Sequence, residues 1–219
     1  MKNLFMIILC ICFTTVNAQK RELDSFTDLE QFTELASKSE WKIAKKRKGI
    51  VLKYRKLKFS DTLEVREMKA EFSVFGSLNK MYEVLKSPKK IEQWNENVKD
   101  MKILQDMDST WISHYMYKIP HLFTQQDLVI EHVAKKKGNG FVITAFAKPK
   151  YIPDVKDFRR EKFYLSEWRV MPAMSGQLSV EFSVVSISDS KIPRFIKDPI
   201  IQNKLIDSFL NLQKLMKSE

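Results

Sequence analysis

The chain has 219 residues, of which 44% are hydrophobic and 30% charged, so it suits one domain and is too apolar for wholesale disorder. Its 5 glycines are too few for a collagen-like or glycine-rich repetitive sequence. The formal net charge of +11 favours acidic partners, such as anionic lipid or nucleic acid, and says nothing about the fold.

The N-terminal segment has the layout of a secretory signal. A weakly basic start precedes the apolar run Leu4–Phe13, and small residues follow as far as Ala18. The run is too short to span a bilayer, which needs about 20 residues; the alternative is a buried N-terminal strand. We predict a signal peptide over residues 1–18 and a secreted or periplasmic protein. Cleavage there removes both cysteines, so the remaining chain has no disulfide and no thiolate ligand.

No internal repeat or low-complexity linker divides residues 19–219, which we predict to form a single domain. Ser77 and Pro88 are helix-start signals, and a change of alternation between Val65 and Met68 suggests a β-bulge. The elements predicted in the first half are a helix over 24–38, strands over 41–43 and 50–54 around a basic turn at 45–49, a strand over 62–74, and helices over 77–86 and 88–94.

The second half is rich in strands and ends in a long helix. The strands are predicted over 98–105, 110–118, 126–134, 140–147, 160–171 and 177–186, and the helix over 194–217. Asn139 and Gly140 are expected to supply the positive φ angles of a tight hairpin turn. Runs of strands with segregated helices indicate an α+β fold with an antiparallel sheet, and a curved sheet that grips the last helix would enclose an interior.

Motifs for catalysis and for cofactors are missing. The sequence has no G-x-S-x-G, no P-loop and no G-x-G-x-x-G, and His114, His121 and His132 lack metal-ligand spacing. The carboxylates are scattered among lysines and are interpreted as a solvated surface, although two distant strands could still bring a catalytic pair together. We therefore predict no cofactor, no metal and no catalysis.

Two basic clusters, Lys45–Lys48 and Lys135–Lys137, lie in predicted turns. Neither is interleaved with the stacking aromatics typical of single-stranded nucleic-acid binding, and a secretory signal also argues against such a partner. The clusters are interpreted as solubilising hairpin tips or as a peripheral contact with an anionic membrane.

The strands carry the strongest functional indication. One face of 110–118 bears Trp111, Ser113, Tyr115 and Tyr117, while 126–134 places His132 on an apolar face and 177–186 alternates cleanly. The polar-tipped aromatic stripe fits either the wall of a ligand cavity or an ordinary half-buried strand. His132 is either a satisfied core residue or a functional one.

Three segments resemble the centre of the START domain, the steroidogenic-acute-regulatory-related lipid-transfer family. They are 94–104 (WNENVKDMKIL), 110–115 (TWISHY) and 120–130 (PHLFTQQDLVI), and 168–172 (WRVMP) and the C-terminal helix follow in matching order. With its signal, the chain resembles a secreted bacterial-type member. Gln126 stands where the family has an arginine before Asp127. Tyr115 and His132 fall at the positions of the acid–arginine pair of sterol-binding members. They could hydrogen-bond to each other, and we expect this polar spot to orient the headgroup of a ligand.

The resemblance implies a helix-grip fold that binds a lipid or other hydrophobic molecule in an internal cavity, for transfer or for sensing, as a monomer. The expected cavity residues are Ser113, Tyr115, Tyr117, Ile130, His132, Val180, Phe182 and Phe209. The expected entrance residues are Pro120, Leu122, Phe123, Ile192, Phe195 and Ile196. One alternative is a cyclase- or hydrolase-like enzyme on the same fold, with Tyr115 or His132 as acid or base. A second is an interaction module whose cavity its own side chains fill.

Overall fold

The computed structural model describes residues 26–119, 124–187 and 194–218, and of residues 194–197 the backbone alone. The described elements are α2 (Leu29–Glu34), β1 (Ser37–Lys38), β2 (Lys42–Arg47), β3 (Ile50–Lys58), β4 (Glu64–Phe75), α3 (Leu78–Lys86), α4 (Pro88–Trp94), β5 (Val98–Met107), β6 (Thr110–Tyr117), β7 (Gln125–Lys137), β8 (Gly140–Ala147), β9 (Phe158–Arg160), β10 (Tyr164–Pro172), β11 (Gln177–Ser186) and α5 (Arg194–Lys217). They form an α+β fold, as predicted.

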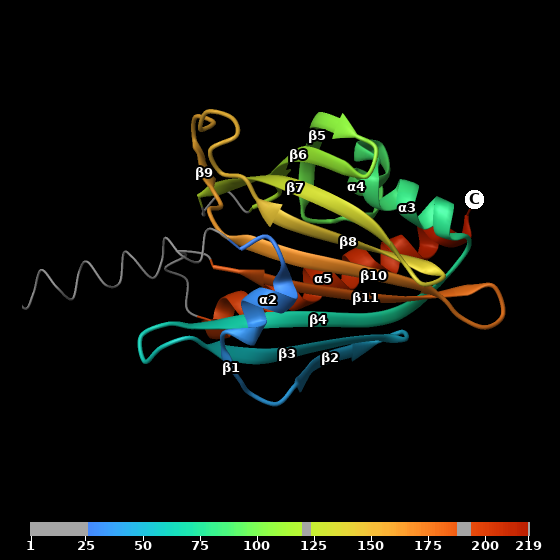
Figure 1. Ribbon diagram of the computed structural model, residues 1–219, viewed down its shortest axis with the longest axis horizontal. Helices are drawn as coiled ribbons and strands as arrows, with labels where there is room; N and C mark the ends of the chain where they lie inside the picture. Colours follow the sequence, from blue (N-terminus) through green and yellow to red (C-terminus); the bar gives the residue numbers. More distant parts are fainter. Residues whose placement is uncertain (1–25, 120–123, 188–193, 219) are drawn as a thin grey trace, which may run out of the picture.

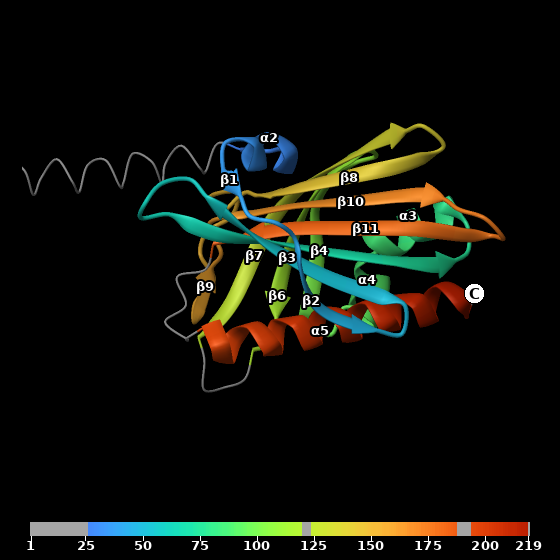
Figure 2. The ribbon, with the colours of Figure 1, turned by 90° about the horizontal axis from the view of Figure 1, so that it is seen from below.

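All described strands belong to one curved sheet in the order β1-β3-β4-β11-β10-β8-β7-β6-β5, with β2 added to β3 and β9 to β7. Every pair is antiparallel except β7 and β9. The helix α5 runs along the concave face, while α2 lies on the opposite, convex face (Figures 1 and 2). This is the helix-grip arrangement expected from the sequence.

Local capping determines the helices that the sequence predicted correctly. The Ser77 hydroxyl accepts a hydrogen bond from the backbone N–H of Lys80 at 3.3 Å, and α3 begins immediately after it. Pro88 occupies the first turn of α4, where its missing N–H costs nothing. The helix α5 spans the predicted 194–217.

The first helix is shorter than the predicted 24–38. The Asp28 side chain caps α2 by accepting from the N–H of Gln31 at 3.0 Å, so the described helix begins at Leu29. At its other end Ser37 and Lys38 pair with β3 as strand β1, which removes them from the helix.

The predicted bulge in β4 is absent. Its register with β3 is continuous from Glu64 to Glu71, and its register with β11 from Glu67 to Phe75. The alternation changes phase because different faces are covered at the two ends. Val65 packs on the convex face with α2, whereas Phe72 packs on the concave face with α5. Packing of α2 on the convex face also explains why Val185 of β11 is buried, although its side of the strand was expected to face solvent.

Two further strand boundaries and one turn conformation differ from the predictions. Lys45–Arg47 belong to β2, so only Lys48 and Gly49 form the first basic turn. In the β7–β8 hairpin the positive φ of 55° belongs to Gly138, not to Asn139 or Gly140. The predicted strand 160–171 is two strands, because Arg160 ends β9 beside β7 and Tyr164 starts β10 beside β11.

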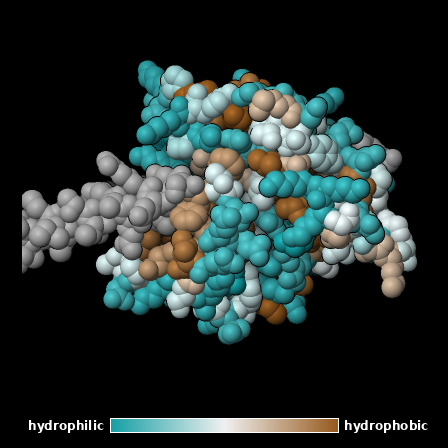
Figure 3. Space-filling view, in the orientation of Figure 1, coloured by the Kyte–Doolittle hydropathy of each residue, from teal (hydrophilic) through white to brown (hydrophobic). Residues whose placement is uncertain are grey.

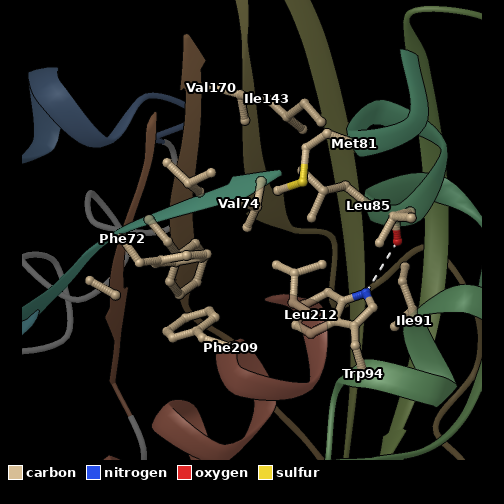
Figure 4. Close-up of a cluster of buried hydrophobic side chains, with 14 of the residues drawn as sticks. Phe72, Val74, Met81, Leu85, Ile91, Trp94, Ile143, Val170, Phe209 and Leu212 are labelled. Atoms are coloured by element: carbon tan, nitrogen blue, oxygen red, sulfur yellow. Dashed lines mark hydrogen bonds between the residues drawn. The ribbon is translucent and has the colours of Figure 1, made fainter. Parts of the chain in front are cut away.

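The main hydrophobic core fills much of the space between the concave face, α3, α4 and α5 (Figure 4). Phe72 stacks on Phe209 with ring centroids 4.9 Å apart, and the indole N–H of Trp94 donates to the carbonyl of Val84 at 3.2 Å. The convex face of the sheet, which Figure 3 shows, is largely hydrophilic, with hydrophobic residues scattered between charged ones.

The strand β5 lies at one edge of the sheet, with register shifts between Val98 and Asp100 and between Ile103 and Gln105.

Candidate functional site

Aromatic hydroxyls gather over one part of the concave face. The register places Ser113 of β6 opposite Ile130 of β7, and Ile130 opposite Ala147 of β8. The β8–β10 register pairs Phe146 with Leu165, which puts Tyr164 beside Ala147 on the same face. Tyr117 lies on this face too, at the end of β6. The small Ala147 therefore lies in a row between larger neighbours.

Three phenols in this region are deeply desolvated. Burial raises the pKa of Tyr115, and the nearby Tyr164 raises it further. Burial raises the pKa of Tyr164 to about 12. Burial raises the pKa of Tyr117 well above its ordinary value, and Tyr164 and Tyr115 add to that effect. Tyr117 and Tyr164 nevertheless keep part of their surface accessible. Their hydroxyl groups are thus desolvated, although neighbouring side chains do not cover the two residues completely.

His132 does not form the expected polar pair with Tyr115. Their ring centroids are 6.2 Å apart, and no hydrogen bond joins them in the described part of the chain. His132 instead stacks on Trp111, with centroids 4.7 Å apart and planes 5° from parallel. Its Nε2 atom has no hydrogen-bond partner among the described residues, and burial lowers the pKa of His132 to about 3. The imidazole is therefore neutral at physiological pH.

The remaining expected cavity residues lie on the concave face but are packed. Ser113 has no exposed surface, Ile130 is 4% exposed and Val180 is 1% exposed. Phe182 lies 5.7 Å from Phe209, centroid to centroid, in the main core. Their role as ligand contacts stays a prediction.

The entrance residues cannot be placed in the same way. Pro120, Leu122, Phe123 and Ile192 lie outside the described residues. Phe195 and Ile196 lie in the first turns of α5, where only the backbone is described. The nearest described contact joins Arg66 of β4 to Asp198 of α5, so an ion pair links this end of the helix to the sheet.

A buried polar network on the convex face was missed by sequence reasoning. Asp127 is fully buried, and its Oδ2 atom accepts from His114 Nε2 at 2.8 Å and from Arg160 Nε and Nη2 at 2.9 and 2.7 Å. Arg160 also donates to the carbonyls of Pro149 and Ile152, at 2.9 and 3.3 Å. The network thus fixes β9 and the segment before it against β7.

Interpreting the carboxylates as a solvated surface was wrong for three of them. Asp127, Glu67 and Glu161 are 0%, 4% and 8% exposed. Glu67 lies 2.5 Å from Arg55, yet burial outweighs that ion pair and raises the pKa of Glu67. Gln126 is the signal that could have revealed the network. Because Gln126 replaces the arginine expected beside Asp127, a buried Asp127 needs a cation from elsewhere in the chain.

Other kinds of site find little support in the described part of the chain. It contains no cluster of three or more His, Cys, Asp and Glu side chains able to hold a metal ion. Within the same part, none of the helices combines the length and the apolar character that crossing a membrane requires. A surface groove of about 450 Å³ lies between Arg47 and Lys48 of the first hairpin and the second half of α5.

A concave antiparallel sheet closed by a long C-terminal helix, with desolvated phenols between them, defines a helix-grip protein. The sequence profile of the START domain matches residues 27–147, more than half of the chain. The chain therefore belongs to the START domain family.

Solved structures agree on the fold. The STAR-related lipid transfer protein of Xanthomonas axonopodis is 19% identical with a TM-score of 0.73, over 82% of this chain and 100% of that one. Human StAR-related lipid transfer protein 5 is 19% identical with a TM-score of 0.70, over 93% and 97%. The Zhui aromatase/cyclase of Streptomyces sp. R1128 is 9% identical with a TM-score of 0.53, over 70% and 94%. A search of curated protein sequences finds no match.

Proposed function

We propose that this protein binds a lipid or other hydrophobic molecule, without catalysis, between the concave face of the sheet and α5. The observation that carries the proposal is the pair Tyr117 and Tyr164, which are desolvated yet partly accessible. Trp168, a partly exposed side chain on the same strand and the same face as Tyr164, adds apolar surface. Burial of a hydrocarbon chain against such surface is worth about 25 cal/mol per Å². The family membership supports the same function.

The residues at this site are poorly suited to the acid–base catalysis that the enzyme alternative requires. A general acid or base works best with a pKa near the operating pH. Burial lowers the pKa of His132 to about 3 and raises that of Tyr115, so both move away from neutrality. The Nε2 atom of His132 also lacks a hydrogen-bond partner among the described residues. These features favour binding over the cyclase- or hydrolase-like function.

Native mass spectrometry of the protein purified from a lipid-rich host tests the binding function. We expect a discrete added mass of one ligand per chain. The variant Ala147→Trp fills the space beside Tyr164, so we expect it to keep its circular dichroism spectrum and to lose the added mass. The variant Ile43→Trp, at a position 55% exposed, is the matched control and should keep the ligand. A bare wild-type protein that also takes up none of a panel of fluorescent lipids would contradict the proposal.

We further propose that the protein is secreted after cleavage near Ala18 and contacts anionic membranes through its basic clusters. Lys46–Lys48 and Lys135–Lys137 are exposed and adjoin hairpin turns. Near an anionic surface each lysine contributes about 1 kcal/mol, an attraction that salt screens.

Vesicle flotation tests this contact. We expect binding to phosphatidylglycerol vesicles at low salt, loss of binding in 1 M salt, and no binding to phosphatidylcholine. Glutamate at positions 135–137 should weaken binding several-fold, whereas Lys58→Glu, which changes one exposed lysine outside both clusters, should have a much smaller effect. Equal binding to both kinds of vesicle would refute the electrostatic contact.

A further inference from the structure

We propose that the part of the concave face formed by Ala147, Tyr164 and, further along β6, Tyr117 receives an uncharged polar group of the ligand, a hydroxyl or a carbonyl, and rejects an anionic one. The inference rests on the proposed lipid binding and specifies the class of ligand. It also moves the polar contact from the expected Tyr115 and His132 to a different pair of residues.

The arrangement of the strands places one small residue in this row of side chains. Ala147 of β8 lies between Ile130 of β7 and Tyr164 of β10, and all three belong to the concave face. Alanine contributes one methyl group where its neighbours contribute large side chains. The side chains of this row therefore extend least far from the sheet at Ala147. Tyr117 and Tyr164 keep accessible surface here, whereas Trp111 and Ser113, nearer the other end of β6, have none.

The chemistry of the lining is neutral. Each phenol offers one O–H donor and can also accept, which matches the acceptor oxygens of a hydroxyl or carbonyl. His132, whose ring centroid lies 6.2 Å from that of Tyr115, is also uncharged at physiological pH. Arg66, a cation on the concave face, is bound by Asp198 and stacks on Tyr54, so its charge is already engaged.

The electrostatic field at the phenols disfavours an anion. Burial is the main reason that the pKa of Tyr117 is high, followed by the neighbouring phenols, but Glu161 and Asp127 raise it further. Both carboxylates therefore oppose negative charge at this hydroxyl, although Arg160 binds Asp127 and Arg159 lies 3.7 Å from Glu161. A carboxylate or phosphate placed beside Tyr117 would meet like charge in a desolvated site.

Four C18 compounds with the same chain separate the possible end groups: oleyl alcohol, oleate, oleylamine and octadec-9-ene. In competition by native mass spectrometry, we expect occupancy by the alcohol to exceed that of oleate and of octadec-9-ene at least tenfold. We expect a smaller advantage over oleylamine, because its ammonium loses its hydration on burial but meets the nearby carboxylates. Tyr117→Phe and Tyr164→Phe should each reduce the advantage of the alcohol over the hydrocarbon several-fold and leave the hydrocarbon unchanged. Tyr151→Phe, at a side chain 42% exposed, is the matched control and should change nothing.

The outcomes distinguish this inference from the function on which it rests. Preference for oleate or oleylamine, equal binding of all four compounds, or tyrosine variants without effect would overturn the uncharged-group inference and leave lipid binding intact. Failure of all four compounds, together with the absence of co-purified ligand, would overturn both. The wild-type competition decides the class of ligand even if a variant does not fold.

Discussion

Replacing Asp127 by leucine is expected to lower the free energy of unfolding by about 3–5 kcal/mol, because the change leaves a buried cation without its anion. Arg160 is 7% exposed, and two of its nitrogens bind Asp127 Oδ2 at 2.9 and 2.7 Å. The carbonyls that Arg160 also contacts can accept hydrogen bonds but carry no compensating charge. Urea unfolding followed by circular dichroism measures the loss.

The double variant Asp127→Leu/Arg160→Leu removes both charges together. It should be less destabilised than the sum of the two single variants, because apolar replacement of a whole buried pair is often tolerated. Asp61→Asn, which breaks the exposed pair with Lys58, is the control and should change stability little. Additive single effects, or a loss below about 1 kcal/mol for Asp127→Leu, would show that the network does not hold the fold together.

The second large effect is a pH dependence that originates at His132. The folded protein keeps this imidazole neutral down to a pKa of about 3, whereas the unfolded chain takes up a proton near the ordinary value of 6.5. Between these two values the unfolded state binds more protons, so stability falls as the pH falls. The stabilisation from this residue is complete above about pH 6.5 and decreases by up to about 1.4 kcal/mol per pH unit below it.

His132→Phe tests this dependence because phenylalanine can keep the stack on Trp111 without a titrating group. Between pH 7 and pH 4.5 we expect the wild type to lose about 2 kcal/mol more than the variant in urea unfolding experiments. All other titrating groups are shared by the two proteins and cancel in the difference. Parallel pH profiles would mean that His132 is protonated, or exposed to water, in the folded state.

The parts of the fold that could be predicted are those with local causes. Ser77 and Pro88 fix the starts of α3 and α4 through groups within one helical turn, so the sequence alone is sufficient. The phase change in β4 was also visible in the sequence. It was misinterpreted because a bulge and a change of covered face give the same pattern, and only the position of α2 separates them.

The polar networks could not be predicted because their partners are distant in the sequence. Asp127 and Arg160 are 33 residues apart and meet only because β9 pairs with β7 in parallel before the chain crosses to β10. The hydrogen bond that Tyr115 and His132 could have formed is absent for a related reason. Both residues face the interior as expected, but the diagonal between them is too long for a hydrogen bond, and Trp111 lies directly opposite His132.

The edge strand β5 bears on how this protein avoids aggregation. A sheet that does not close into a barrel leaves a row of unpaired backbone groups, which can recruit a strand from another molecule. In β5 two register shifts interrupt the regular ladder, and Lys99, Asp100 and Lys102 place charges along it. An incoming strand would meet a bent template with charges of both signs. The irregularity of β5 therefore opposes fibril-like stacking of copies while the ligand-binding face remains intact.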